Sequence, residues 1–289
     1  MKMSFPLTVN SIRRIGGPSV FHRGFIAVVQ SLIPVLLLTG CKDDDQAPDG
    51  QVPQLEFTLC ATFPHDTAAY TEGLIYYNDS LFESTGSPYF LPQCRSVFGP
   101  VNLATGRITV RVELDKDEYF GEGIAYLQGK FYQVTYKNKT GFIYDASTYE
   151  TTGQFSYLSD EAWGLTTDGQ ALIMSDGTNI LTYIDPQTFL VTRFLSVTEN
   201  GTPERYLNEL EFIDGYIYAN VWLTNMIVKI DTSGGKVVAC ADLQDLRNKA
   251  ESKYSASREM NGIAYDPDSG RIFITGKCWP EIYQIELKQ

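Results

Sequence analysis

Five segments of the chain share one pattern, and this repetition limits the possible folds more than any other feature of the sequence. In each segment a polar or aromatic residue and a Gly or Glu lead into an apolar stretch, a tight turn and a second apolar stretch, which is typical of a β-hairpin. The segments recur about every 45 residues, the length of a four-stranded β-propeller blade. They are TEGLIYYNDSLFEST from Thr71, GEGIAYLQGKFYQVTY from Gly121, AWGLTTDGQALIMSDG from Ala162, LNELEFIDGYIYANVW from Leu207 and MNGIAYDPDSGRIFITGK from Met260.

The two ends of the repeat array complement each other. The fifth repeat has only EIYQIEL after its hairpin and lacks an outer strand, whereas LEFTLCATF, residues 55–63, precedes the first repeat and has no partner of its own. We expect this N-terminal strand to complete the last blade, because an open seam would expose unpaired backbone groups. The predicted fold is therefore all-β, a five-bladed β-propeller over residues 55–289. A β-sandwich is the alternative, although it does not require such even spacing.

The first 40 residues have a different character from the repeats. A basic segment precedes the uncharged stretch FIAVVQSLIPVLLLTG, which ends at Cys41 and is too short for a membrane span. LLLTGC resembles the lipobox of bacterial lipoproteins, so we expect a signal peptide over residues 1–40 and lipidation of Cys41. An ordinary signal peptide with a chance cysteine is the alternative. Residues 41–54 are expected to be a flexible acidic tether, and the protein an exported lipoprotein of the cell envelope, on the periplasmic side of a membrane or at the cell surface.

Composition argues against several classes of function. A net charge of −12 does not suit a nucleic-acid surface. Beyond the signal segment His65 is the one histidine, and we expect it to be a turn or cap residue, so a histidine zinc site or a Ser-His-Asp relay has little support. No dinucleotide or phosphate-loop motif occurs; we expect no cofactor, no metal and a monomer. The four remaining cysteines can pair in three ways; they are Cys60, Cys94, Cys240 and Cys278.

The repeats also predict where a site should lie. In a propeller, the residues that open the first strand and close the second strand of each blade surround one mouth of the central channel. The openers are Glu72, Glu122, Trp163, Asn208 and Asn261. The closers include Tyr136, Asp176, Trp222 and Lys277. Aromatic walls with a few polar groups predict a ligand pocket at this mouth.

One connection of the first repeat is unusually long. The stretch SPYFLPQCRSVFG follows a second strand, so it should lie on the same face as the pocket. Cys94 in this stretch and Cys278 beside Lys277 belong to blades that are adjacent across the ring closure. This makes them the candidate pair for a disulfide.

The motifs along the repeats resemble one enzyme family. FPHDTAAYTEGLIY, LFESTG, DEYFGEGIAY, WGLTTDG, LNELEFIDGYIYANVW and NGIAYDPDSGRIFITGKCWP are similar, in order from Phe63 to Leu287, to the plant-type glutaminyl-peptide cyclotransferases. The resemblance implies a five-bladed propeller that converts the N-terminal glutamine of peptides or proteins to pyroglutamate and releases ammonia, without a catalytic metal. By matching motifs it implies Glu122 as the catalytic acid/base. The pocket would be completed by Phe120, Trp163, Asn208, Trp222 and Lys277.

Two parts of the predicted pocket depart from the family pattern. Tyr70 and Glu72 stand in YTEG, where the family usually has FTQG, and Tyr136 stands where a tryptophan is common. We expect these residues, together with Asn261, to contact the substrate. Glu72 and Glu122 should face each other across the mouth, and like charges raise one pKa of such a pair unless Lys277 neutralises them.

The chemistry of cyclisation suits these residue types. The α-amine must lose a proton to attack the γ-carboxamide, and the departing nitrogen must gain one, so a single carboxylate within reach of both can carry the proton. We expect Lys277 and Asn208 to bind the amide oxygen as negative charge develops on it. The glycines on either side of Glu122, Gly121 and Gly123, are expected to let the backbone approach a small substrate.

Two other functions remain open at this point. The first is a surface-tethered, ligand-binding propeller that has lost turnover, which the departures at Glu72 and Tyr136 would allow. The second is a calcium-dependent, lactonase-like propeller hydrolase, in which Glu72, Asn208 and Asn261 would contribute to a metal cage. A lysine in the same mouth, Lys277, argues against a cation there.

Overall fold

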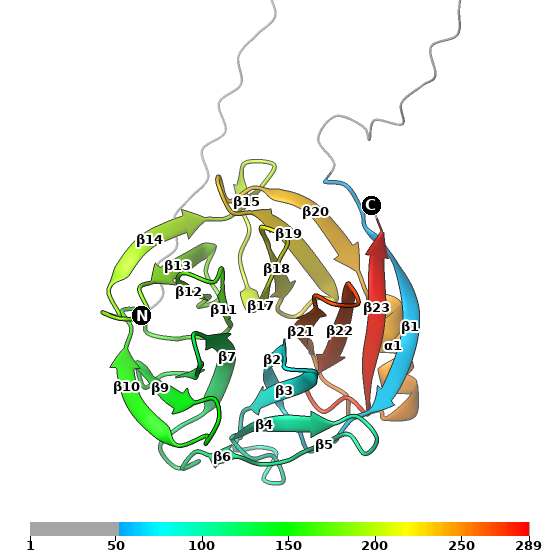
Figure 1. The fold of residues 1–289 in the computed structure, drawn as a ribbon. Helices are drawn as coiled ribbons and strands as arrows, with labels where there is room; N and C mark the ends of the chain where they lie inside the picture. Colours follow the sequence, from blue (N-terminus) through cyan, green and yellow to red (C-terminus); the bar gives the residue numbers. More distant parts are fainter. Residues whose placement is uncertain (1–51, 289) are drawn as a thin grey trace, which may run out of the picture. The chain divides into compact units, whose positions relative to one another are not determined.

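Each sequence repeat forms one antiparallel sheet, and the five sheets surround a central axis (Figure 1). The computed structural model describes residues 52–288. Blade 2 consists of β7 (Gly121–Leu127), β8 (Lys130–Thr135), β9 (Thr140–Asp145) and β10 (Thr151–Ser156). Blade 3 consists of β11 (Leu165–Thr167), β12 (Leu172–Met174), β13 (Ile180–Ile184) and β14 (Val191–Ser196). Blade 4 consists of β17 (Leu207–Ile213), β18 (Tyr216–Val221), β19 (Met226–Asp231) and β20 (Val237–Asp242).

The N-terminal strand closes the ring, as predicted. The last blade has the order β1-β23-β22-β21, and β1 lies antiparallel to β23, with Phe63 opposite Ile282. The first and last strands of the described chain therefore share one sheet (Figure 1). Blade 5 consists of β21 (Met260–Asp266), β22 (Arg271–Gly276), β23 (Glu281–Lys288) and β1 (Glu56–Pro64).

Blade 1 departs from the regular four strands. Its outer edge is divided between two short strands, both of which pair with β4. The strands are β2 (Thr71–Tyr77), β3 (Ser80–Thr85), β4 (Val97–Asn102), β5 (Arg107–Ile108) and β6 (Val112–Glu113). Between β3 and β4 lies the long connection noted in the sequence.

Two elements were not predicted from the sequence. A small hairpin, β15 (Thr198–Glu199) and β16 (Thr202–Pro203), precedes blade 4, and a helix, α1 (Gln244–Lys253), connects blade 4 to blade 5. The helix buries Leu246 and Ala250 against the core. It accounts for the longer interval before the fifth repeat.

The N-terminal predictions lie mostly outside the described residues. The signal peptide, Cys41 and most of the tether fall there. Pro53 and Gln54, at the end of the expected tether, are paired with the outer strand of blade 4: the amide N–H of Cys240 donates to the carbonyl of Pro53 at 2.9 Å. Within residues 52–288, no helix has the length and hydropathy needed to cross a membrane.

Glycines near the channel allow the inner strands to approach one another. A Cβ on Gly123 would lie 2.3 Å from the amide nitrogen of Leu165 in blade 3, and a Cβ on Gly121 would lie 2.8 Å from the carbonyl oxygen of Thr85 in blade 1. Real Cβ atoms do not come this close. The expectation that these two glycines clear space for a substrate is therefore wrong, because they clear space for the neighbouring blades.

The fourth repeat breaks this glycine pattern. Its LNEL motif places Glu209 where the other four repeats have glycine. The buried Glu209 carboxyl group accepts hydrogen bonds from the amide of Leu74 in blade 1, at 3.0 Å, and from the amide of Ile263 in blade 5, at 2.8 Å. One side chain therefore crosses the central channel and joins three blades.

Candidate active site

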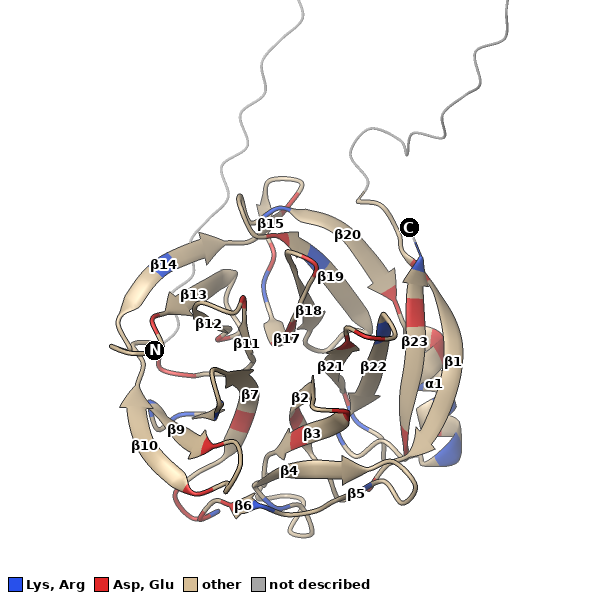
Figure 2. Ribbon diagram, viewed as in Figure 1, with Lys and Arg blue, Asp and Glu red and all other residues tan. Residues whose placement is uncertain are grey.

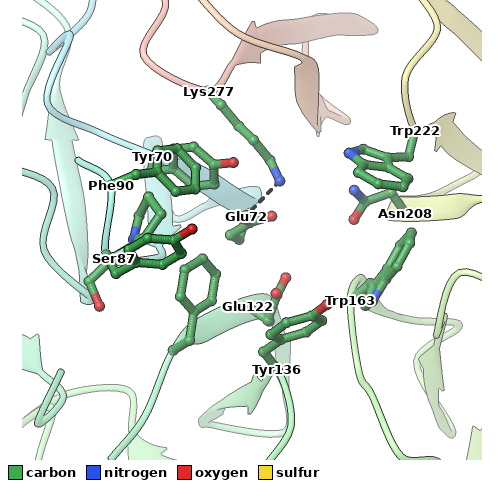
Figure 3. A pocket seen from close by; sticks show the side chains of 13 residues that line it. Tyr70, Glu72, Ser87, Phe90, Glu122, Tyr136, Trp163, Asn208, Trp222 and Lys277 are labelled. Carbon is green, nitrogen blue, oxygen red and sulfur yellow. Dashed lines mark ion pairs between the residues drawn. The ribbon is translucent and has the colours of Figure 1, made fainter. Parts of the chain in front are cut away.

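A cavity of about 480 Å³ lies at the predicted mouth of the channel (Figure 3). It contains every predicted catalytic and substrate-contacting residue except Asn261. Its size falls within the usual range of small-ligand pockets, roughly 300–1,000 Å³. The lining residues are Tyr70, Glu72, Ser87, Pro88, Tyr89, Phe90, Phe120, Glu122, Tyr136, Trp163, Asn208, Trp222 and Lys277.

Two carboxyl groups meet in the pocket. Glu122 opens β7 and is 4% exposed, and Glu72 opens β2 and is equally buried. Each affects the pKa of the other. Burial raises the pKa of Glu72, although Lys277 opposes this effect. Burial, and next the charge of Glu72, raise the pKa of Glu122 well above its ordinary value against the opposing effect of Lys277.

Lys277 forms an ion pair with one member of the acidic pair. It follows β22, and its Nζ lies 2.8 Å from Oε1 of Glu72 (Figure 3). Burial lowers the pKa of Lys277, but the charge of Glu72 outweighs this effect and the pKa is raised. The ammonium also lies 4.8 Å from the centre of the Tyr70 ring. Glu72 is thus the ion-pair partner of Lys277, whereas burial and the charge of Glu72 favour the protonated form of Glu122.

Asn261 does not line the cavity. It is fully buried, and its Nδ2 donates to Oε2 of Glu72 at 3.2 Å and to the carbonyl oxygen of Thr71 at 3.1 Å. The expected substrate contact is therefore corrected. The amide is turned toward β2 and orients the Glu72 carboxylate from behind.

Aromatic rings form the walls. Trp163 and Trp222 pack edge to face with 5.4 Å between ring centres, on the side of the cavity opposite Tyr70 and Phe90 (Figure 3). Trp163 is fixed by a hydrogen bond from its Nε1 to Glu161. The third tryptophan, Trp279, lies in the core instead. Such walls suit the methylene groups of a short side chain.

Asn208 presents an unused polar atom. The residue lies on β17 and is buried, and its Oδ1 has no hydrogen-bond partner within residues 52–288. A buried amide oxygen without a partner costs free energy, and a ligand with an N–H group would remove that cost. Asn208 faces the cavity between the tryptophans and the acidic pair (Figure 3).

Four lining residues were not identified individually from the sequence. Ser87, Pro88, Tyr89 and Phe90 belong to the connection between β3 and β4. Its length was the available signal, and it placed the segment on the correct face. The conformation that brings these side chains to the cavity has no periodic pattern to reveal it.

The expected disulfide is absent from the described structure. Cys94 and Cys278 are both buried and free. The two thiols lie in a small cluster with Tyr70. Adjacent blades bring the two cysteines together without a covalent bond.

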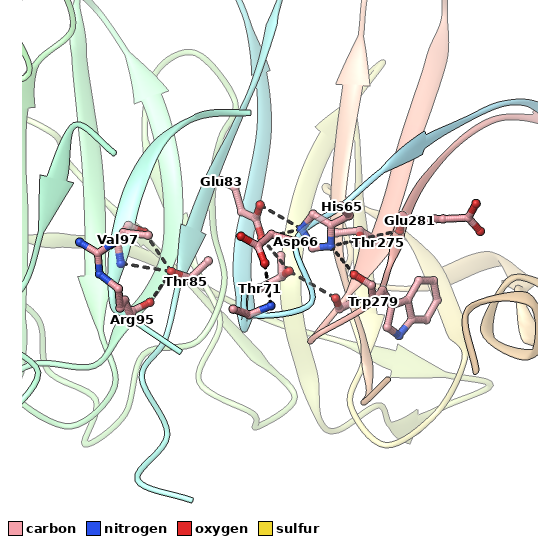
Figure 4. A network of polar contacts seen from close by, with 12 residues as sticks. His65, Asp66, Thr71, Glu83, Thr85, Arg95, Val97, Thr275, Trp279 and Glu281 are labelled. Atoms are coloured by element: carbon pink, nitrogen blue, oxygen red, sulfur yellow. Dashed lines mark hydrogen bonds and ion pairs between the residues drawn. The ribbon is translucent and has the colours of Figure 1, made fainter. Parts of the chain in front are cut away.

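A second group of buried polar and charged side chains surrounds His65 (Figure 4). His65 places Nε2 3.1 Å from both carboxylate oxygens of Glu83, and its Nδ1 lies 2.8 Å from the carbonyl oxygen of Trp279. The hydroxyl of Thr71 donates to Glu83 at 2.7 Å. Burial lowers the pKa of His65, but the charge and hydrogen bond of Glu83 outweigh it, and the pKa is raised. His65 is thus a buried ion-pair residue rather than a turn or cap residue.

Comparison with known proteins agrees with this arrangement. A sequence model of the glutamine cyclotransferase family matches residues 32–287. The chain belongs to this family. It is 42% identical over 236 residues to the glutaminyl-peptide cyclotransferase of Arabidopsis thaliana. The matched region covers 81% of this chain and 72% of the plant protein. The crystal structure of Myxococcus xanthus glutaminyl cyclase superimposes with a TM-score of 0.75 and 29% identity, over 82% of this chain and 99% of that one.

The glutamine cyclotransferase assignment also bears on the metal-dependent alternative. Within residues 52–288, no group of three or more His, Cys, Asp or Glu side chains is placed to hold a metal ion. Lys277 takes the position beside Glu72 where a cation would have to bind. The family assignment supports a cyclotransferase over a calcium-dependent lactonase.

Proposed function

We propose that this chain is a glutaminyl-peptide cyclotransferase, which converts the N-terminal glutamine of peptides or proteins to pyroglutamate and releases ammonia. The observation that carries the proposal is the buried Glu122, beside the Glu72–Lys277 ion pair and lining an aromatic pocket. Family membership supports the same reaction.

In this mechanism Glu122 transfers one proton within each turnover. The α-amine nitrogen attacks the side-chain carbonyl carbon, a C–N bond forms, and the amine gives up a proton. The bond to the carboxamide nitrogen then breaks, and that nitrogen takes up a proton and leaves as ammonia. A free α-amine has a pKa of about 7.7–8.0. A carboxyl group whose pKa is raised by burial is better matched to it than an ordinary one, so Glu122 can act as both base and acid.

The other polar groups stabilise the charge that develops. The carbonyl oxygen of the substrate becomes negative in the tetrahedral intermediate, and the Lys277 ammonium is the cation in the pocket that can face it. Because Lys277 is already paired with Glu72, that ion pair fixes the position of the ammonium before substrate binds. The unpartnered Oδ1 of Asn208 can accept a hydrogen bond from a substrate N–H.

The cellular setting is part of the proposal. The N-terminal sequence supports export and a lipid anchor at Cys41, which would place the enzyme on the periplasmic side of a membrane or at the cell surface, as a monomer. Lys and Arg positions are scattered among the blades (Figure 2), which suits peptide substrates rather than nucleic acid. Membrane fractionation of the chain and of Cys41→Ala tests the anchor, since the variant should lose membrane association.

Ammonia release tests the reaction. The protein is incubated with a Gln-Gly dipeptide, with and without a chelator, and ammonia is measured together with the mass of the peptide product. We expect equal ammonia release in both conditions and a pyroglutamyl product. If the dipeptide binds but no ammonia is released, the protein has lost turnover. If the chelator abolishes activity, the enzyme depends on a metal.

A further inference from the structure

The connection between β3 and β4 is the longest of its kind in the ring. It spans residues 86–96, whereas the equivalent connections in blades 2, 4 and 5 span residues 136–139, 222–225 and 277–280. We propose that this segment, the 86–96 loop, forms a binding site for the second residue of the substrate and favours an aromatic or large apolar side chain there. The proposal rests on the proposed function and deepens it, because it names the class of peptide that the site prefers.

The 86–96 loop is held in place by its neighbours. The Gly86 amide donates to the carbonyl of Tyr70 at 2.9 Å, and the Thr85 hydroxyl donates to the carbonyl of Arg95 at 2.6 Å. At the far end of the loop Cys94 is buried against Cys278. A loop fixed in this way can present side chains to a ligand without a large loss of conformational entropy.

The side chains at the tip of the loop are aromatic and exposed. Tyr89 is 95% exposed and Phe90 is 47% exposed. The Phe90 ring packs edge to face on Tyr70, at 6.5 Å, and Arg258 lies 4.9 Å from its centre on another side. Tyr89 packs edge to face on Phe90, with 5.3 Å between ring centres. Exposed aromatic rings held on a fixed loop do not add to the core, and they are typical of binding surfaces.

The aromatic tip is continuous with the catalytic pocket. Ser87, Tyr89 and Phe90 line the same cavity as Glu122 and Lys277. A glutamine whose amine and carboxamide both reach Glu122 occupies the base of that cavity, so the rest of the peptide must leave past the walls. Phe90 forms the wall opposite the tryptophans (Figure 3). The second residue of the peptide is therefore the occupant that this wall can contact.

A pair of dipeptide amides tests the inference in the unmodified protein. The ratio of kcat/KM for Gln-Phe amide to that for Gln-Gly amide is measured, and we expect it to be about ten, as for an apolar side chain that gains a partly buried site. The ratio is then measured for Tyr89→Ala and Phe90→Ala, in which it should fall to about three or less. Leu190→Ala is the matched control. Leu190 is 67% exposed, but it lies between β13 and β14, at the opposite end of the blades from the mouth.

The outcomes separate the two proposals. Equal kcat/KM values for the two dipeptides in the unmodified protein would overturn the second-residue site and leave the cyclotransferase proposal intact. A ratio that both loop variants retain would overturn it as well. Absence of ammonia from both dipeptides would instead refute the proposed function, and the second-residue site with it.

Discussion

Two buried charge clusters lie back to back in this protein and have different roles. The catalytic cluster joins Glu122, Glu72 and Lys277, and the closure cluster joins His65 and Glu83. Successive residues of one strand serve both, because Thr71 donates to Glu83 and Glu72 faces the pocket. Alternation of side chains along β2 therefore separates the two clusters by a single residue.

The surroundings of the two clusters differ in how completely their polar atoms are paired. In the closure cluster both ring nitrogens of His65 and both oxygens of Glu83 have partners within the protein (Figure 4). Beside the catalytic cluster, by contrast, Oδ1 of the cavity-lining Asn208 has no partner within residues 52–288. Complete pairing stabilises a fold, whereas unused polar atoms beside a cavity leave contacts for a ligand. Burial of charge alone does not identify an active site.

The largest expected effect comes from removing the acid/base. Glu122→Gln should lower kcat by about 10²–10⁴-fold, because the amide cannot carry the proton. The thermal transition should stay close to that of the parent. Glu118→Gln, which changes an exposed carboxylate at the approach to the same strand, is the control and should keep full turnover. Undiminished ammonia release by Glu122→Gln would end the mechanism.

The closure cluster should affect stability instead of turnover. Glu83→Gln leaves His65 buried without its counter-ion, and we expect a loss of about 3 kcal/mol, or roughly 6–12 °C in Tm. The pKa of His65 is raised in the folded state. The ion pair therefore contributes its full stabilisation of the fold below pH 6.5, the ordinary pKa of histidine, and this contribution is lost as the pH rises through the raised pKa. The loss of stability caused by Glu83→Gln should therefore become smaller toward alkaline pH.

An exposed ion pair provides the comparison for that measurement. Glu113→Gln breaks the pair with Arg95, in which both side chains are about half exposed. It should cost less than about 1 kcal/mol. Thermal unfolding of both variants is measured across the same pH range. If Glu83→Gln and Glu113→Gln lose the same stability, the buried closure cluster does not stabilise the fold more than an exposed ion pair.

The smallest effect is expected at Glu72. Glu72→Gln removes a charge that raises the pKa of Glu122 and frees Lys277 to lower it further. The pKa of Glu122 should fall, so the acid limb of the pH–rate profile should move to lower pH while kcat stays within about tenfold of the parent. An acid limb that does not move would remove Glu72 from the electrostatics of the site.

The fold was largely predictable from the sequence, because turns and apolar alternation repeat in every blade. Helix α1 was not predictable, because its sequence QDLRNKAESK buries only Leu246 and Ala250 and has little apolar periodicity. The position of Glu122 followed from its repeat. The roles of Gly123 and Asn261 could not be predicted. A glycine or an amide near a channel gives the same sequence pattern whether it contacts a ligand or a neighbouring strand.

Glu209 has a consequence for which part of a polypeptide can react. Its carboxyl group reaches from blade 4 to the amides of Leu74 and Ile263 and so obstructs the axis below the pocket. A peptide that enters from the mouth therefore cannot continue along the axis past this carboxyl group, and ammonia departs by the entrance that the peptide used.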